Sequence, residues 1–294
     1  MKHLINEALW WAESTLNTAH IDTAMLLAFV FNQDRAWLYA HSEISLSERQ
    51  WKKFQKLIER RQRREPVAYL TGHQEFYGLD FLVNKNVLIP RPETELIIDY
   101  LKDKLLVNTR PLIVDVGTGS GVLAITAAKV WPGARVVAID NSAAALKVAR
   151  ANARRHGVGK QIKFFKGDLL HPLYKGHPLR VPLKGCPLYL LANLPYLSVS
   201  TWRQTQPEVR LYEPRHALLG GRDGLKFYRE LIKQLASTRA PLVTQGAPLL
   251  TVLLEIDPHQ SKPLSKIIKK ALPSASIEIK KDLAGLERLL IMRL

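Results

Sequence analysis

The sequence predicts an α/β fold in which a mostly parallel sheet, with helices on both faces, follows a small helical N-terminal domain and a β-hairpin linker. Three observations lead to this prediction. Residues 1–70 carry apolar side chains at helical spacing and contain no glycine. Residues 72–90 combine aromatic and β-branched side chains around a glycine. From residue 111 onward, short apolar runs alternate with helical segments, which is typical of a parallel sheet.

Three helices are predicted within residues 1–70. Their apolar residues recur at helical spacing in Leu4-Ile5-Leu9, Leu26-Leu27-Val30-Phe31 and Trp51-Phe54-Leu57-Ile58. Asp22 or Thr23 is the expected cap of the second helix. The third helix leads into four arginines, Arg60, Arg61, Arg63 and Arg64. We interpret this arginine cluster as a solvated helix end, with a contact to RNA or an acidic partner as the alternative.

The middle of the chain predicts a hairpin and a domain boundary. Residues 76–83, Phe-Tyr-Gly-Leu-Asp-Phe-Leu-Val, have the composition of a β-hairpin. Pro90-Arg91-Pro92 then interrupts the chain, and residues 93–105 predict a helix. The predicted organisation is therefore a helical domain over residues 1–72, a hairpin linker over 73–90 and an α/β domain over 91–294.

The α/β domain is predicted from alternating strands and helices. Buried strands are expected at residues 112–116, 135–139, 162–166, 189–192 and 249–256, with helices over 121–130 and 142–156. Residues 276–280 and 288–292 form a last pair of strands with no helix between them. We expect this pair to be an antiparallel hairpin on the edge of the sheet.

Composition limits the class of protein. The hydrophobic fraction of 47% supports a sizeable core, and no apolar stretch approaches the roughly 20 residues of a membrane helix. Polar residues come too early at the N-terminus for a signal peptide. The one cysteine, Cys186, has no partner for an intramolecular disulfide, and no Cys/His cluster has zinc spacing. We expect a cytoplasmic, monomeric protein with no membrane segment and no metal.

The net charge of +17 is concentrated in one part of the chain. Residues 1–89 hold 11 Lys/Arg and 10 Asp/Glu, a net of +1, so residues 90–294 carry the remaining +16. Such a field attracts RNA, ribosomal surfaces or acidic proteins. Solubility and lineage bias explain the charge equally well, so contact with RNA or the ribosome stays an open alternative.

The strand at residues 112–116 ends in a glycine-rich turn, Asp115-Val116-Gly117-Thr118-Gly119-Ser120-Gly121. Glycines let the backbone approach a ligand closely, and the following helix offers free N–H groups. A dinucleotide fingerprint would need Gly or Ala at position 122, where this chain has Val. The turn instead resembles the first motif of S-adenosylmethionine-dependent methyltransferases, in which the acidic residue helps to orient the turn and the methionine end of the cofactor.

Two further acidic residues follow the next two predicted strands. Asp140 ends one strand, where its carboxylate can accept hydrogen bonds from both ribose hydroxyls. Asp168 follows the other and is a candidate partner for the adenine amino group, with Leu169 against the ring. Each acid alone is more often a cap or turn residue. Their recurrence on consecutive strand–helix units favours a cofactor, S-adenosyl-L-methionine rather than NAD.

The candidate acceptor site is the tetrapeptide Asn193-Leu194-Pro195-Tyr196, which follows the fourth predicted strand. Asn and Pro are common in ordinary turns. At the carboxyl edge of this sheet, however, the carboxamide and the backbone carbonyl can accept two hydrogen bonds from an NH2 group while the ring packs on its face. The tetrapeptide therefore predicts transfer of a methyl group to an amide or amine nitrogen.

Nearly end to end, the chain resembles the release factor glutamine methyltransferase family (HemK/PrmC). The segments that carry the resemblance are residues 66–72 (Pro-Val-Ala-Tyr-Leu-Thr-Gly), 76–78 (Phe-Tyr-Gly), 87–95 (Val-Leu-Ile-Pro-Arg-Pro-Glu-Thr-Glu), 207–210, 212–214, 220–225 and 281–285. The segment at 89–95 is highly specific for this family. Sister enzymes that act on a ribosomal-protein glutamine typically diverge just after its Pro-Arg.

The resemblance implies a seven-stranded, Rossmann-like methyltransferase domain, with the helical N-terminal domain helping to recognise the substrate. It implies methylation of the Gln side-chain amide in the Gly-Gly-Gln motif of class 1 peptide chain release factors, a protein methylation linked to translation termination. By the same resemblance, residues 117–121, Asp140, Asp168, Leu169 and Asn193 contact the cofactor. Residues 193–196 hold the glutamine.

The chain departs from the family at two positions. Leu194 stands where the family usually has Pro, and Asp257 where it often has Gly. Leu supplies the same backbone carbonyl but not the fixed φ of Pro. The resulting Asn-Leu-Pro-Tyr also resembles the acceptor motif of rRNA adenine dimethyltransferases. The alternatives are therefore an adenine-N6 methyltransferase acting on rRNA or DNA, a ribosomal-protein glutamine methyltransferase, or a non-catalytic RNA- or ribosome-binding module.

Overall fold

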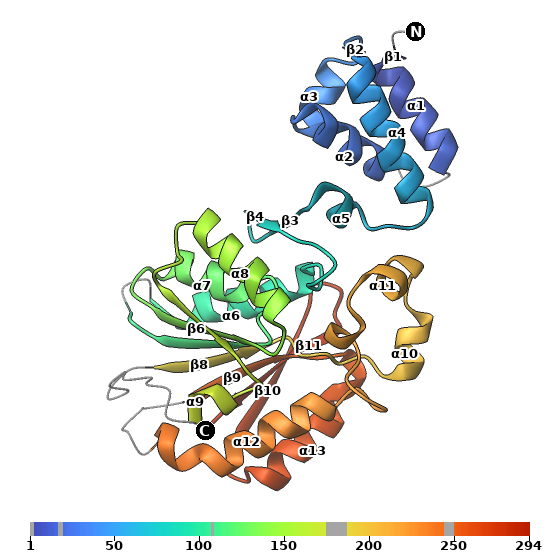
Figure 1. Ribbon diagram of the computed structural model, residues 1–294. Helices are drawn as coiled ribbons and strands as arrows, with labels where there is room; N and C mark the ends of the chain where they lie inside the picture. The colour runs from blue at the N-terminus through green and yellow to red at the C-terminus, as the bar shows by residue number, and fades with distance from the viewer. Residues whose placement is uncertain (1–2, 17–19, 107–108, 175–186, 244–249) are drawn as a thin grey trace. The chain divides into compact units, whose positions relative to one another are not determined.

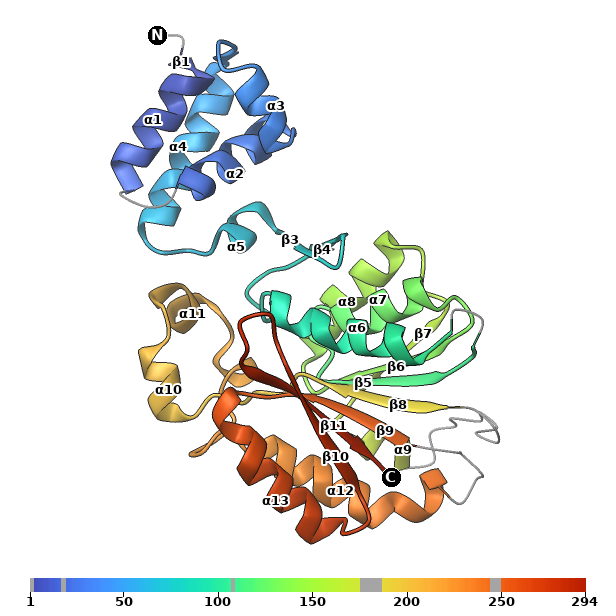
Figure 2. The ribbon, with the colours of Figure 1, turned by 180° about the vertical axis from the view of Figure 1, so that it is seen from behind.

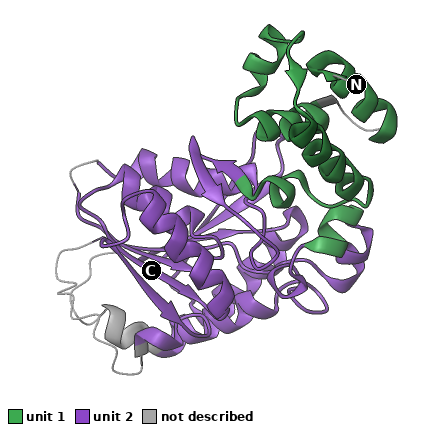
Figure 3. Ribbon diagram, turned by 45° about the horizontal axis from the view of Figure 1, so that its top comes forward, with its two compact units in different colours: residues 1–73, 206–212 green, residues 74–205, 213–294 purple. Residues whose placement is uncertain are grey.

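The computed structural model describes residues 3–16, 20–106, 109–174, 187–243 and 250–294 (Figure 1). The chain forms two compact units, one of residues 1–73 and 206–212 and the other of residues 74–205 and 213–294 (Figure 3). Within the described ranges no helix is long and apolar enough to cross a membrane, and no group of three or more His, Cys, Asp or Glu is arranged to hold a metal ion. Cys186 lies outside the described residues.

The smaller unit is a helical bundle. Its elements are α1 (Ile5–Leu16), α2 (His20–Phe31), α3 (Arg35–Ala40), α4 (Glu48–Gln62), α5 (Val67–Thr71) and the paired two-residue strands β1 (His3–Leu4) and β2 (Ser45–Leu46). A capping box at Ser47 starts α4, and Phe54 and Ile58 on its apolar face are fully buried. The predicted cap of the second helix was wrong. Because α2 begins at His20, Asp22 lies in its first turn and Thr23 is buried within it.

A short helix from later in the chain, α11 (Pro207–Tyr212), belongs to this smaller unit. Glu208 on α11 accepts hydrogen bonds from Arg61 and Arg64, each at 3.0 Å, and Asp22 accepts one from Arg61 at 2.9 Å. The Arg61 side chain is only 10% exposed. The interpretation of the arginine cluster as a solvated helix end was therefore wrong for Arg61, because two carboxylates hold it in the interior of the unit.

The larger unit is built on the predicted sheet. Its strands are β5 (Leu112–Val116), β6 (Arg135–Asp140), β7 (Ile162–Lys166), β8 (Leu188–Ala192), β9 (Leu250–Glu255), β10 (Ser276–Lys281) and β11 (Glu287–Arg293). They lie in the order β10-β11-β9-β8-β5-β6-β7, and β10 and β11 are the antiparallel members. This confirms the predicted α/β class with seven strands and the antiparallel hairpin at one edge. The β3 (His73–Phe76) and β4 (Leu79–Leu82) strands pair separately, as the hairpin prediction requires.

Helices cover both faces of the sheet (Figures 1 and 2). One face packs against α6 (Glu95–Lys104), α7 (Val122–Val130) and α8 (Ala143–Arg155), and the other against α12 (Lys226–Val243) and α13 (Ser261–Ala271). The remaining helical pieces are η1 (Pro92–Thr94), α9 (His171–Tyr174), α10 (Val199–Gln204), η2 (Arg215–Ala217) and η3 (Pro258–Gln260). Each face has its own apolar core, with Trp131 fully buried in one and Tyr228 in the other.

The strand order determines where a ligand can bind. From β5 the chain proceeds outward through β6 and β7 and then returns to β8 on the other side of β5. Loops that leave β5 and β8 therefore diverge, which opens a crevice at the carboxyl ends of these two parallel strands.

Candidate functional site

A cavity lies at this switch point. It is lined by Asn86, Val87, Leu88, Pro90, Arg91, Thr94, Asp115, Gly117, Thr118, Gly119, Ser120, Val122, Leu123, Ile139, Asp140, Asn141, Ala145, Gly167, Asp168, Leu169, Asn193, Leu194, Pro195, His216, Ala217 and Phe227. The structure thus brings most of the predicted site residues to one cavity. Two of them, Gly121 and Tyr196, do not line it.

Asp115 is 1% exposed and stabilises the glycine-rich turn that follows β5. One oxygen of its carboxyl accepts hydrogen bonds from the Thr118 hydroxyl at 2.6 Å and from the Ala124 backbone N–H at 3.1 Å. Burial raises the pKa of Asp115 to about 7, although both hydrogen bonds oppose the rise. Gly117 and Gly119 have φ of +76° and +56°, a region that side chains with a Cβ rarely adopt.

Gly121 has a packing role in the same turn. It has φ +89°, and a Cβ there would lie 2.9 Å from the Ile125 side chain and 3.2 Å from Ala149. Its lack of a side chain therefore lets α7 and α8 approach each other. Asn152 on α8 adds a hydrogen bond to the Ser120 carbonyl at 2.8 Å. These contacts keep the turn in one conformation at the floor of the cavity.

The acids after β6 and β7 are placed differently. Asp140 accepts hydrogen bonds from the Gly119 and Ser142 backbone N–H groups at 2.9 and 2.8 Å. Burial raises its pKa, while these bonds and the nearby His216 oppose the rise. Leu169, which follows Asp168, is a buried non-glycine residue with φ +48°. Such a conformation is strained, and strained residues of this kind cluster at active sites and ligand clamps.

The acceptor tetrapeptide follows β8 directly. Asn193 donates a hydrogen bond from Nδ2 to the Thr94 hydroxyl oxygen at 3.0 Å. A Cβ on Gly117 would lie 3.1 Å from the Leu194 side chain, which is 3% exposed, so the tetrapeptide packs on the glycine turn. Tyr196 lies outside the cavity lining, and its hydroxyl donates to Glu255 at 3.2 Å. Burial raises the pKa of Tyr196 well above its usual value.

Two later loops support the backbone of the tetrapeptide. Gly220 and Gly224 lie so close that a Cβ on either would overlap the Pro195 or the Tyr196 carbonyl. Gln260 donates to the Tyr196 carbonyl at 2.8 Å, and a capping box with Asp257 fixes Gln260. The departure at Asp257 thus has a structural role, because its carboxylate caps η3 beside the acceptor loop.

Residues 86–94 form one wall of the cavity, and no motif in the sequence predicted this role for them. Glu213, whose side chain is 1% exposed, accepts a hydrogen bond from the Ile89 N–H at 3.0 Å and pairs with Arg91. This carboxylate anchors the segment whose last residue, Thr94, contacts Asn193. The specificity of the family segment at 89–95 was a usable signal for this wall. His216 and Phe227 also line the cavity, and no sequence pattern indicated either residue.

Known proteins resemble the chain over its whole length. The model of the PrmC N-terminal domain matches residues 7–72, and that of a methyltransferase domain matches residues 111–179. The chain is 34% identical over 295 residues to the release factor glutamine methyltransferase of Dictyoglomus turgidum, covering 99% of this chain and 98% of that protein. The chain belongs to the release factor glutamine methyltransferase family. The family member from Bacillus subtilis is 35% identical over 291 residues, covering 97% and 96% of the two chains.

Solved structures agree with the fold of this release factor glutamine methyltransferase family member. The N-terminal domain of human METTL16 in complex with SAH matches with a TM-score of 0.51 at 12% identity, covering 91% of this chain and 92% of that one. The catalytic domain of the same human protein, in complex with a MAT2A 3'UTR hairpin, gives 0.53 at 13% identity, covering 85% and 84%. At such identities the likeness establishes the methyltransferase fold alone.

Proposed function

We propose that this chain transfers a methyl group from S-adenosyl-L-methionine to the side-chain amide nitrogen of the Gln in the Gly-Gly-Gln motif of class 1 peptide chain release factors. The observation that carries the proposal is the placement of Asn193 and Leu194 beside the glycine-rich turn, in a chain that belongs to this family. The donor and acceptor groups of one methyl transfer thereby share one cavity.

The cavity fits the cofactor. Positive φ at Gly117 and Gly119 exposes backbone without a Cβ, so a ligand can approach the turn closely. The Asp140 oxygens accept the Gly119 and Ser142 backbone N–H groups, and the remaining lone pairs of the carboxylate can accept the ribose hydroxyls. We assign Asp115, the turn residues 117–120 and Asp140 to the cofactor site, together with Asp168 and Leu169 on the adenine side. When bound, S-adenosylmethionine supplies an electrophilic methyl group on a sulfonium.

Asn193 and Leu194 provide the acceptor chemistry. Because Asn193 donates from Nδ2 to Thr94, its Oδ1 is the atom left to accept a hydrogen bond from a substrate NH2. The Leu194 carbonyl, which lies 3.5 Å from the Tyr228 hydroxyl, is the second acceptor. An amide nitrogen is a weak nucleophile, so two hydrogen bonds that hold its NH2 contribute mainly through orientation. We assign Pro195 and Tyr196 to shaping this acceptor site.

Asn193→Ala tests the role of the carboxamide. The variant removes one of the two acceptors and leaves the glycine-rich turn intact. We expect cofactor affinity to stay within about twofold and kcat to fall by about 10²-fold, since a misplaced acceptor loses the orientation term. Calorimetry and turnover measured on the same preparation separate the two effects. Unchanged turnover contradicts the assignment.

Labelled S-adenosylmethionine tests the substrate class when the enzyme is offered a class 1 release factor, rRNA and ribosomal proteins in parallel reactions. We expect label on the factor and none after its Gly-Gly-Gln glutamine is replaced by alanine. Label on RNA alone means that the Asn-Leu-Pro-Tyr tetrapeptide serves an adenine methyltransferase. Label on a ribosomal protein alone assigns the chain to the sister activity.

The proposal also covers the organisation of the protein. We infer a recognition domain over residues 1–72, a linker over 73–90 and a catalytic domain over 91–294, in a monomeric cytoplasmic enzyme. Contact with RNA or the ribosome is an additional element that the charge of residues 90–294 favours. Light scattering tests the monomer, and a salt titration of ribosome binding tests the contact.

A further inference from the structure

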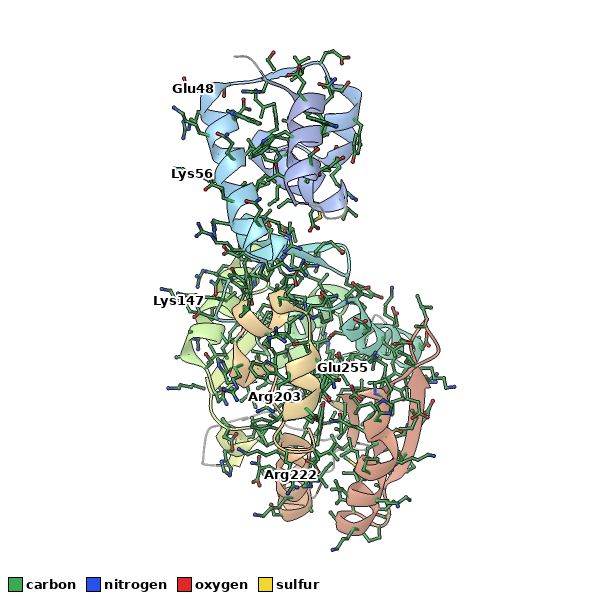
Figure 4. All side chains as sticks on the ribbon, turned by 90° about the vertical axis from the view of Figure 1, so that its right-hand side faces the viewer. Glu48, Lys56, Lys147, Arg203, Arg222 and Glu255 are labelled. Atoms are coloured by element: carbon green, nitrogen blue, oxygen red, sulfur yellow. The ribbon has the colours of Figure 1, made fainter. Side chains whose placement is uncertain are left out.

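A buried carboxyl group that the proposed chemistry does not use lies next to the acceptor site. Glu255, labelled in Figure 4, is the last residue of β9. It is 2% exposed. Its Oε1 accepts a hydrogen bond from the Tyr196 hydroxyl at 3.2 Å, and its Oε2 has no hydrogen-bond partner within the described part of the chain. An unpaired buried carboxyl oxygen costs stability, so its presence in this position calls for a function.

The surroundings connect this carboxyl to Asn193. The Thr94 hydroxyl is near enough to the Glu255 carboxyl to lower its pKa, and the same hydroxyl oxygen accepts the Nδ2–H of Asn193 at 3.0 Å. A hydroxyl that accepts from one side has its own proton free for the other side. The Thr94 hydroxyl can therefore donate its proton to the Glu255 carboxylate while its oxygen accepts the N–H of Asn193.

The direction of this chain matters for the substrate. A carboxamide has one donor end and one acceptor end, and an NH2 substrate must meet the acceptor end. If the Asn193 side chain flipped, it would present its own NH2 to the substrate NH2, and two donors would face each other. A group that keeps Nδ2 on Thr94 therefore selects the productive orientation.

We propose that Glu255 is a positioning residue of the acceptor site, which orients Asn193 through the Thr94 hydroxyl and holds Tyr196 directly. The inference rests on the proposed function, in which Asn193 accepts the substrate NH2. The carboxylate has two acceptor oxygens: Oε1 accepts the Tyr196 hydroxyl, and Oε2, which has no hydrogen-bond partner within the described residues, is the one open to the Thr94 hydroxyl. A neutral side chain of the same shape cannot serve both hydroxyls in this way.

The charge state of Glu255 gives a second line of support. Burial raises its pKa to about 7; the Thr94 and Tyr196 hydroxyls and Arg288 on β11 oppose the rise, and Glu93 adds to it. The Tyr228 hydroxyl also faces this residue, through the Glu255 backbone carbonyl. When the Glu255 carboxyl is protonated, one of its oxygens carries a hydrogen-bond donor, whereas the Thr94 and Tyr196 hydroxyls both need an acceptor. Peptide binding should therefore weaken as the pH falls below about 7.

Thr94→Val tests the inference with the smallest change. It keeps the shape and removes the hydroxyl, and Thr126→Val is the matched control, because Thr126 is 1% exposed and its hydroxyl has no partner within the described part of the chain. We expect the Kd of a Gly-Gly-Gln peptide, measured by calorimetry with S-adenosylhomocysteine present, to rise about tenfold for T94V and to stay unchanged for T126V. T94S should restore wild-type binding.

A double-mutant cycle separates positioning from general damage. In an Asn193→Ala background, T94V should cause no further loss, because the Thr94 hydroxyl acts through the Asn193 carboxamide. Equal losses in both backgrounds, or wild-type peptide binding by T94V, overturn the inference.

Glu255→Gln should weaken binding about tenfold at pH 8 and should lose the wild-type dependence on pH around 7. A pH profile like that of the wild type contradicts the role of Glu255. If E255Q does not fold, the T94V cycle still decides the role of Thr94, and the pH profile of peptide binding by D115N, which lacks the other carboxyl whose pKa is about 7, decides that of Glu255. Failure of the proposed function has a different signature, since the wild-type enzyme itself then neither labels a release factor nor binds the peptide.

Discussion

The acceptor backbone should be sensitive to a substitution that lies outside the cavity lining. Gly224 has φ +77°, and a Cβ there would overlap the Tyr196 carbonyl and the Gln260 side chain. Gly285 is a matched control, because it has φ +78° and a Cβ added to it would meet no atom within 4 Å. The two Gly→Ala substitutions therefore impose the same backbone strain, and only the substitution at 224 displaces the acceptor loop.

The magnitudes follow from these contacts. Placing Ala in the left-handed region costs about 1–2 kcal/mol, which is the whole expected loss for Gly285→Ala. For Gly224→Ala, loss of the Gln260 hydrogen bond to Tyr196 adds about 1 kcal/mol. Relieving the overlap requires a shift of the acceptor loop of about 1 Å, and a misplacement of that size lowers a rate by about 10²-fold.

Urea unfolding and turnover with a release factor substrate measure both variants. We expect G285A to be destabilised but to turn over at the wild-type rate, and G224A to lose somewhat more stability and about 10²-fold in kcat. Cofactor affinity should be the same in both, since neither residue lines the cavity. Equal turnover by the two variants would refute the claim that this loop positions the acceptor backbone.

Two further predictions concern charged groups away from the acceptor. The pKa of Asp115 is about 7 in the fold against 3.8 as its ordinary value, so its contribution to stability is greatest below about pH 4 and is lost as the pH rises through 7. Asp115→Asn should therefore gain stability relative to wild type between about pH 4 and pH 8, by up to about 4 kcal/mol in urea unfolding; a pH-independent difference contradicts this. Glu208→Ala should lower the stability of the smaller unit by about 1–3 kcal/mol, because it leaves Arg61 with one carboxylate partner. A thermal melt equal to that of wild type would show that the Arg61–Glu208 ion pair does not stabilise the unit.

The strands and the hairpin were predictable because their signals are local. Each of the seven strands lies within one residue of its predicted bounds. Short apolar runs between helical segments are consistent with few structures other than buried strands. The glycine-rich turn and the tetrapeptide were placed by the same logic. Parallel strands bring their carboxyl ends to one edge, so motifs that follow β5, β6, β7 and β8 must gather there.

Contacts between distant segments were not predictable from periodicity. The sequence around Arg61 predicts a solvated residue. In the structure Arg61 donates a hydrogen bond to Glu208, which lies 147 positions later in the chain. The sequence predicts only that Glu255 ends a strand, and the residues beside it do not indicate its hydrogen bond with Tyr196. Tyr196 itself was expected beside the substrate, and the structure places it outside the cavity lining, with its hydroxyl on Glu255. Its contact with the substrate stays a proposal.

Site-resolved mass spectrometry of an intact class 1 release factor tests the central claim most directly. The factor is incubated with the enzyme and S-adenosylmethionine, digested and mapped. We predict one methyl group, located on the side-chain nitrogen of the Gly-Gly-Gln glutamine and missing when the enzyme carries Asn193→Ala. A methyl group at any other residue, or an unmodified factor in a reaction that methylates RNA, would contradict the account.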